Sequence, residues 1–207
     1  MSALGTSDAV SSFTRVLCVF IGMSLISSCF GKSTYRWKEE VQLHDGRVIV
    51  IERSVRTGEV PVEIGQPPGE SDYTLRFETE DGKAVTWEAG KWFDPMILDF
   101  FKGVPYVVAT GRKGVAYERH GCPKPPYFVF RLNAGSWEQI HYEELPKPVR
   151  RANLYSSPTR KDRFGAVRSG FVTADNVKDS HLGLDSFYKE VREDMPMPLT
   201  CIARGAK

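Results

Sequence analysis

Residues 37–54 read WKEEVQLH-DG-RVIVIERS, two partly alternating runs of apolar and polar residues around an Asp-Gly pair. Such a pair is typical of a β-hairpin, because it accepts the positive φ angles of a two-residue type I′ turn. Residues 48–51, VIVI, form a continuous apolar run, which favours a strand covered on both faces. The stretch therefore predicts an antiparallel hairpin that turns at Asp45 and Gly46.

A second hairpin is predicted after the first. Residues 73–77 alternate between apolar and polar side chains, as in a strand. Asp81 and Gly82 supply a turn, and residues 84–87 form the returning strand. The intervening residues 58–72 are rich in Pro, Gly and Glu and are predicted to form a loop.

Further short apolar runs follow the hairpins, and turn residues separate them. Regular spacing of this kind is typical of an antiparallel meander in a sandwich, a barrel or a propeller-like sheet. The predicted fold class is therefore mainly β, with one C-terminal amphipathic helix. The later runs predicted to be strands are 106–110, 115–117, 127–132, 136–142 and 199–203.

Two stretches carry helical signals. Asp94 and Pro95 are expected to begin a short helical turn that ends near Phe101, because proline is favoured at the start of a helix. Apolar residues recur at i, i+3, i+4 and i+7 within residues 182–192, which predicts the C-terminal amphipathic helix. Its core face would carry Leu184, Phe187, Tyr188 and Val191.

Composition indicates a globular body with a real core. The chain has 207 residues, of which 41% are hydrophobic and 26% are charged, and this length suits one domain or at most two small ones. The net charge of +2 supplies no strong field for nucleic acid, and the chain shows no aromatic-basic pattern of a known nucleic-acid reader. We therefore expect no nucleic-acid partner.

The N-terminal region has the organisation of an exported protein. Residues 16–26 form an uncharged apolar stretch preceded by Arg15. A membrane-spanning helix needs about 20 apolar residues, so this stretch is too short to span and has the length of a signal-peptide core. Ser27, Ser28 and Cys29 follow, and the chain then turns polar.

Residues 25–29, LISSC, resemble the lipobox of bacterial lipoprotein precursors, in which an aliphatic residue and two small residues precede an invariant cysteine. The resemblance implies that the Cys29 thiol receives a diacylglycerol and that a signal peptidase removes residues 1–28. The alternatives are an ordinary signal peptide, or a buried strand with an incidental cysteine.

The same resemblance implies an organisation for the rest of the chain. Residues 29–34 would tether a single β-rich domain, residues 35–207, to a membrane. The domain would face the periplasm. An aspartate directly after the lipidated cysteine favours inner-membrane retention in such lipoproteins. Phe30 stands there instead, which favours the outer membrane.

This processing would determine which cysteines keep a free thiol. Cleavage would remove Cys18 and lipidation would occupy Cys29, which leaves Cys122 and Cys201 as the remaining thiols. Two remaining cysteines tend to pair in an oxidising compartment, so we predict a Cys122–Cys201 disulfide. The alternative is two buried free thiols.

A basic segment is the main candidate for binding. Residues 147–168 carry seven basic residues against one acid, Asp162. Clustered lysine and arginine attract phosphates and carboxylates, whereas the alternative is a solvated loop. The predicted anion-binding residues are Arg150, Arg151, Arg160, Lys161 and Arg163.

Other chemical signals are weak. His44 beside the Asp45 turn is interpreted as turn chemistry, because further metal ligands are missing. His120, Cys122 and His141 lack the paired spacing of a zinc site, and the chain has no GxSxG or HExxH. We therefore expect no metal, no cofactor and no catalytic residues.

The adjacent carboxylates Glu39 and Glu40 would point to opposite faces of a strand, so they are not expected to form a catalytic pair. The sequence favours a membrane-anchored, non-catalytic envelope module that binds or braces a partner. That partner would be another envelope protein or an anionic envelope component. The alternative is an envelope enzyme acting on cell-wall or lipid material, with a site assembled from separated strands.

Overall fold

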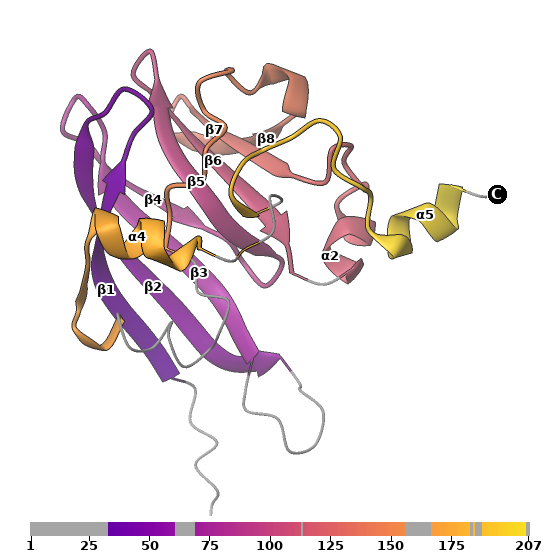
Figure 1. The fold of residues 1–207 in the computed structure, drawn as a ribbon, viewed down its shortest axis with the longest axis horizontal. Helices are drawn as coiled ribbons and strands as arrows, with labels where there is room; N and C mark the ends of the chain where they lie inside the picture. The colour runs from indigo at the N-terminus through magenta and orange to yellow at the C-terminus, as the bar shows by residue number, and fades with distance from the viewer. Residues whose placement is uncertain are drawn as a thin grey trace, which may run out of the picture. The chain divides into compact units, whose positions relative to one another are not determined.

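The computed structural model describes residues 33–60, 69–112, 114–155, 167–182, 184 and 188–205. The chain divides into two compact units, Met1–Gly31 and Lys32–Lys207, and every described residue belongs to the second. The predicted signal peptide and Cys29 lie outside the described residues. The prediction of a mainly β fold is confirmed, since two largely antiparallel sheets dominate the structure and do not close into a barrel (Figure 1).

The first sheet has five strands in the order β4-β3-β2-β1-β9, of which β1 to β4 are labelled in Figure 1. Neighbouring strands are antiparallel, except that β9 runs parallel to β1. The pairs β1–β2 and β3–β4 are the two predicted hairpins. The strands are β1 (Ser33–Gln42), β2 (Val48–Val60), β3 (Gly69–Glu78), β4 (Ala84–Glu88) and β9 (Phe171–Val172).

The strands of this sheet extend beyond the predicted bounds. β1 begins at Ser33, inside the predicted tether at 29–34. β2 continues to Val60 and β3 begins at Gly69, so both ends of the predicted loop at 58–72 are strand. The residues between these two strands lie outside the described part of the chain.

The first hairpin loop is one residue longer than predicted. The Leu43 N–H donates to the Arg47 carbonyl at 2.8 Å, which leaves three residues in the loop. Gly46 has a φ of +87°, whereas Asp45 is not in the left-handed region. A three-residue loop needs a positive φ only at its last residue, where glycine carries no Cβ penalty. The type I′ prediction was therefore wrong, and His44 lies in the loop rather than on a strand.

The first sheet buries only one face. Ile51 and Val55 on β2 are buried, whereas Val48 and Val50 are 51% and 54% exposed. The prediction that the run at 48–51 is covered on both faces was wrong, because one face of this antiparallel sheet meets water.

The second sheet is antiparallel in the order β5-β6-β7-β8. One of its faces shares a core with the first sheet, and the other packs against a second apolar cluster. The Trp137 Nε1–H on β8 donates to the Thr86 carbonyl on β4 at 2.8 Å, which links the two sheets. The strands are β5 (Phe93–Phe101), β6 (Val104–Gly111), β7 (Phe128–Asn133) and β8 (Ser136–Ile140).

The helical turn expected after Asp94 and Pro95 is absent, because these residues lie in β5. β5 is an edge strand, and an edge tolerates proline because its outer side carries no ladder hydrogen bond. Residues 96–100 are buried, so packing on both faces of the strand favours the extended conformation.

The helices differ from those predicted. α2 (Gly114–Arg119) stands where a strand was predicted at 115–117, and α5 (Leu199–Gly205) where one was predicted at 199–203. Two further short helices, η1 (Tyr142–Glu144) and α4 (Ala174–Ser180), were not predicted.

The predicted amphipathic helix at 182–192 is contradicted, since none of its described residues is α-helical. The Val191 N–H donates to the Arg150 carbonyl at 2.8 Å, and the Ala152 N–H donates to the Lys189 carbonyl at 2.9 Å. Backbone pairing between two distant segments therefore prevails over the helical spacing of the apolar residues.

A buried ion pair joins β1 to β2 on the core face of the first sheet. The side chains of Glu39 and Arg53 are 0% and 2% exposed. Arg53 Nη1 donates to the two carboxylate oxygens of Glu39 at 3.1 and 2.9 Å. The guanidinium also lies 5.1 Å from the centre of the Trp37 ring and 5.6 Å from that of Tyr73.

The same pair attaches a distant segment to the sheet. Arg53 Nη1 donates to the Tyr155 carbonyl at 3.1 Å, and the Tyr155 N–H donates to Glu39 at 2.6 Å. The Trp37 Nε1–H adds a further donor to Glu39 at 2.8 Å. A buried carboxylate is tolerated only with partners of this kind, so the network fixes the chain around Tyr155 against the sheet.

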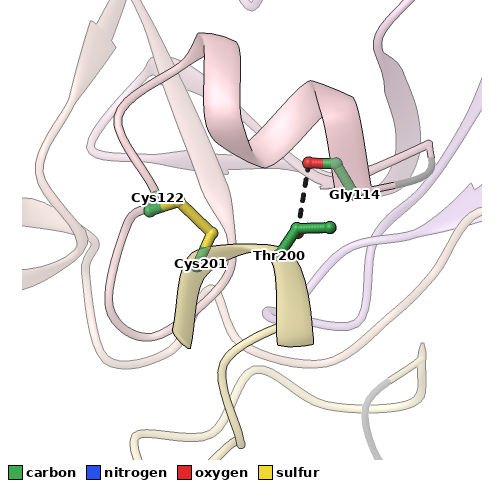
Figure 2. Close-up of a disulfide and its surroundings, with 4 residues drawn as sticks. All are labelled: Gly114, Cys122, Thr200 and Cys201. Atoms are coloured by element: carbon green, nitrogen blue, oxygen red, sulfur yellow. Dashed lines mark hydrogen bonds between the residues drawn. A yellow bond between two sulfur atoms is a disulfide. The ribbon is translucent and has the colours of Figure 1, made fainter. Parts of the chain in front are cut away.

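The disulfide predicted between Cys122 and Cys201 is present and joins the loop after α2 to α5 (Figure 2). Its cysteines are 79 residues apart, and a crosslink over such a loop typically contributes about 2–5 kcal/mol to stability. At the same contact the Thr200 hydroxyl donates to the Gly114 carbonyl at 3.4 Å. A Cβ on Gly114 would collide with the Thr200 side chain, so glycine permits this close approach.

We expect Arg53→Met to lower the free energy of unfolding by about 3–5 kcal/mol, because it leaves the buried Glu39 carboxylate without its cation. The matched control is Arg56→Met on the same strand, where the arginine side chain is 52% exposed. Its removal should cost less than about 1 kcal/mol. Urea unfolding measures both values, and equal losses in the two variants would contradict a structural role for the buried pair.

Candidate functional site

A cleft of about 560 Å³ lies where the β1–β2 loop, α4 and residues 148–153 meet. Small-molecule sites typically have volumes of about 300–1,000 Å³. Beside the cleft, α4 is attached to β1, because the Ala174 N–H donates to Glu40 Oε2 at 3.0 Å. The Thr173 side chain accepts from the Asn176 N–H at 3.2 Å and caps the start of the helix.

His44 enters the cleft from the three-residue hairpin loop. Its Nδ1 lies 2.8 Å from Asp99 Oδ1, and its backbone N–H donates to Asp99 Oδ2 at 2.9 Å. Asp99 on β5 has a side chain only 4% exposed and also accepts from the Phe100 N–H at 2.7 Å. The buried carboxylate thereby fixes both the loop and the orientation of the imidazole.

Asn153 positions the opposite side of the cleft. Its Oδ1 accepts from the Leu98 N–H at 3.0 Å, and its Nδ2 donates to the Leu98 carbonyl at 2.8 Å. The same Nδ2 donates to the Gln42 carbonyl at 3.0 Å. One buried amide therefore holds residues 148–153 against both β5 and the end of β1.

Two cationic residues, Arg151 and Lys189, come from paired segments on this side of the cleft. Arg151 forms an isolated antiparallel bridge with Glu190. The Ala152 N–H donates to the backbone carbonyl of the neighbouring Lys189 at 2.9 Å. Arg151 and Lys189 are both among the residues that line the cleft, and neither forms an ion pair with any described residue. Both charges are therefore available to a ligand.

Further charges complete the lining. Lys178 on α4 adds a third cation, with a side chain 63% exposed and 3.4 Å from Asp175. Glu40 and Asp99 are the acids of the lining, and each is held by backbone N–H groups. Three bases against two acids leave the cleft with an excess of one positive charge when its histidines are neutral.

His181 follows the end of α4 and lines the cleft. Its Nε2 donates to the Leu154 carbonyl at 2.9 Å. Burial is the largest influence and lowers the pKa of His181, although the hydrogen bond to Leu154 and the charge of Glu39 oppose this shift. The charges of Lys189 and Arg151 lower the pKa further. His181 is therefore neutral at pH 7 and adds no charge to the cleft.

Of the five predicted anion-binding residues, the structure describes Arg150 and Arg151, and only Arg151 lines the cleft. Arg151 lines the cleft, whereas the Arg150 guanidinium lies over the Tyr142 ring and 3.4 Å from Glu193. The other three predicted residues, Arg160, Lys161 and Arg163, lie outside the described part of the chain, as does Cys29. The predicted disulfide cysteines join α2 to α5 and do not line the cleft.

Sequence reasoning missed most of this site. His44 was interpreted as turn chemistry, and its partner Asp99 is 55 residues away along the chain. Lys178 and Lys189 lie outside the predicted basic segment. One available signal was the charge at Asp99 within an otherwise apolar run, because a buried acid requires a partner.

Among the described residues, no group of three or more His, Cys, Asp or Glu side chains could hold a metal ion. None of the described helices combines the length and apolar character needed to cross a bilayer. No family model, curated protein or solved structure matches the chain. The cleft and the sequence are therefore the basis for inferring a function.

The half-buried His181 should make stability depend on pH. Its folded pKa is lowered below the ordinary 6.5, so the unfolded chain binds the proton more readily. The free energy of unfolding should therefore fall between about pH 7.5 and about pH 5.5, and His181→Gln should flatten this dependence.

His120, whose pKa is also lowered by burial and by Arg119, contributes with the same sign and stays present in this variant. The matched control is His141→Gln, because His141 is exposed and outside the cleft. Urea unfolding across this pH range measures the slopes. A slope in His181→Gln equal to that of the wild type would show that His181 is not the group responsible.

Proposed function

We propose that the chain is a lipid-anchored bacterial lipoprotein whose folded body binds an anionic component of the cell envelope in the cleft. The body faces the periplasm, with the outer membrane favoured by Phe30, and acts as a non-catalytic module. The observation that carries the binding role is the pair Arg151 and Lys189, two cations without an ion pair among the described residues, beside a fixed His44.

The anchoring part of the proposal is supported by the lipobox-like residues 25–29. Only three residues separate Cys29 from Ser33, where β1 begins, so the tether is at most about 14 Å long. A body on so short a tether stays near the membrane surface, where phosphorylated and carboxylated envelope components are its nearest anionic ligands.

Charge supports the binding part. An isolated surface ion pair stabilises a protein very little, and unpaired cations beside one another repel. Arg151 and Lys189 are nevertheless held on one side of the cleft by backbone pairing. An anion bound between them would relieve this repulsion and form charge-assisted hydrogen bonds.

One observation favours the alternative of an envelope enzyme. A buried carboxylate that orients an imidazole is also the arrangement of a general base, and Asp99 orients His44 in this way. The cleft lining contains no Ser, Thr, Cys or Tyr among the described residues, so a hydrolase would have to use water as its nucleophile. A binding module would release its ligand chemically unchanged, whereas an enzyme would convert the ligand into a product.

Cys29→Ala should release the protein from membranes and abolish incorporation of labelled fatty acid, because the thiol that carries the lipid is lost. Fractionation and radiolabelling of cells expressing the full chain measure both effects. Cys18→Ala is the matched control, since it removes a thiol from the cleaved segment and should leave attachment intact. Continued membrane attachment of the Cys29→Ala protein would refute the anchoring.

The double variant Arg151→Gln/Lys189→Gln should bind inorganic phosphate about tenfold or more weakly, because two charge-assisted hydrogen bonds are lost. NMR titration measures the affinity, and the shifted amides should include those of residues 151 and 189. The charge-matched control is Arg76→Gln/Lys83→Gln, whose exposed residues lie outside the cleft. Equal weakening in both double variants would indicate a general charge effect and refute the site.

A further inference from the structure

We infer that the cleft selects a phosphomonoester that also carries a hydroxyl group, such as a sugar phosphate or glycerol phosphate. The phosphate would lie between Arg151 and Lys189, and the hydroxyl would donate to Nε2 of His44. This inference rests on the proposed anion-binding function and names the chemical class of its ligand.

The hydrogen bonds of Asp99 determine which nitrogen of His44 is the acceptor. The Asp99 carboxylate already accepts the backbone N–H groups of His44 and Phe100. A carboxylate can only accept, so the Nδ1 of His44 at 2.8 Å must donate to it. In the neutral ring the lone pair is then on Nε2.

The Nε2 atom is open to a ligand. No described residue forms a hydrogen bond with it, and it is not among the buried polar atoms that lack a partner. The ring lines the cleft, and the residue's side chain is 23% exposed. An acceptor with fixed orientation on the surface of a cleft selects ligands that bring an O–H or N–H donor.

The cations favour phosphate over carboxylate. Arg151, Lys178 and Lys189 give the lining three separate cationic donors, and the three terminal oxygens of a phosphomonoester can accept from all of them, whereas a carboxylate has only two oxygens. Glu40 belongs to the same lining, and its Oε1, to which no described residue donates, can accept a second hydroxyl. Hydrogen-bond acceptors on His44 and Glu40, together with the cationic residues, are complementary to a phosphate that carries several hydroxyl groups.

The test compares three probes with the full-length, lipid-anchored protein in detergent at about pH 8, where imidazole is neutral. The probes are methyl phosphate, glycerol 3-phosphate and glucose 1-phosphate, and calorimetry measures each affinity. The hydroxylated probes should bind about three- to tenfold more tightly than methyl phosphate, as one added hydrogen bond allows. The tighter of the two hydroxylated probes identifies whether the source is a sugar or a glycerol phosphate.

His44 variants test the acceptor itself. In His44→Asn the shorter amide can still donate to Asp99 but places no acceptor at Nε2, so the preference for hydroxylated probes should disappear. In His44→Gln the amide reaches the Nε2 position, so part of the preference should return. Methyl phosphate, which has no hydroxyl donor, supplies the reference affinity within each variant, so the preference is measured as a ratio of two affinities in the same protein.

The outcomes separate the two proposals. Equal binding of all three probes by the wild type would overturn the hydroxyl preference while the anion site stands. Failure of every probe to bind would overturn both. A preference that persists in His44→Asn would overturn the role of His44.

Discussion

The buried pair of Glu39 and Arg53 is the interaction on which the remaining structure depends. Both groups leave water almost completely, and such burial costs several kcal/mol per ion unless hydrogen bonds replace the lost hydration. Glu39 receives donors from Arg53, from the Trp37 indole and from the backbone of Tyr155. Because one of these donors lies 116 residues away along the chain, the pair is stable only when the distant segment is in place.

This requirement explains how the cleft is assembled. The chain around Tyr155 is fixed to the first sheet, and Asn153 fixes the preceding residues to β5 and to the end of β1. The position of Arg151 is determined by this attachment of its neighbours. The position of Lys189 is determined by its backbone pairing with Ala152. Polar groups in the core thus determine where the two segments that carry these cations join the lining of the cleft.

Local signals in the sequence were sufficient for the hairpins and the fold class. The Asp-Gly pairs at 45–46 and 81–82 lie in the β1–β2 and β3–β4 loops, because a glycine tolerates the positive φ that such loops need. β5 was missed, since the Pro95 signal for a helix start is overruled by burial of the strand. The loop length was also missed, and it is this extra residue that places His44 in the cleft.

Long-range partners account for the rest. The helix expected at 182–192 fails because the described residues of that stretch pair with the chain near Arg150, which no periodicity reveals. Glu39 and Arg53 each interrupt the apolar, inward-facing positions of a predicted strand, so opposite charges at these positions were a usable signal. Their third partner, Tyr155, was not predictable from its own neighbours.

Native-state hydrogen exchange at the Tyr155 amide tests the central claim most directly, because this N–H donates to the buried Glu39. If the network holds the segment, the Tyr155 amide should open with the same free energy as the buried amides of β1 and β2, close to that of global unfolding. Exchange of the Tyr155 amide at the rate of an exposed loop would show that the ion pair does not fix the segment that builds the cleft.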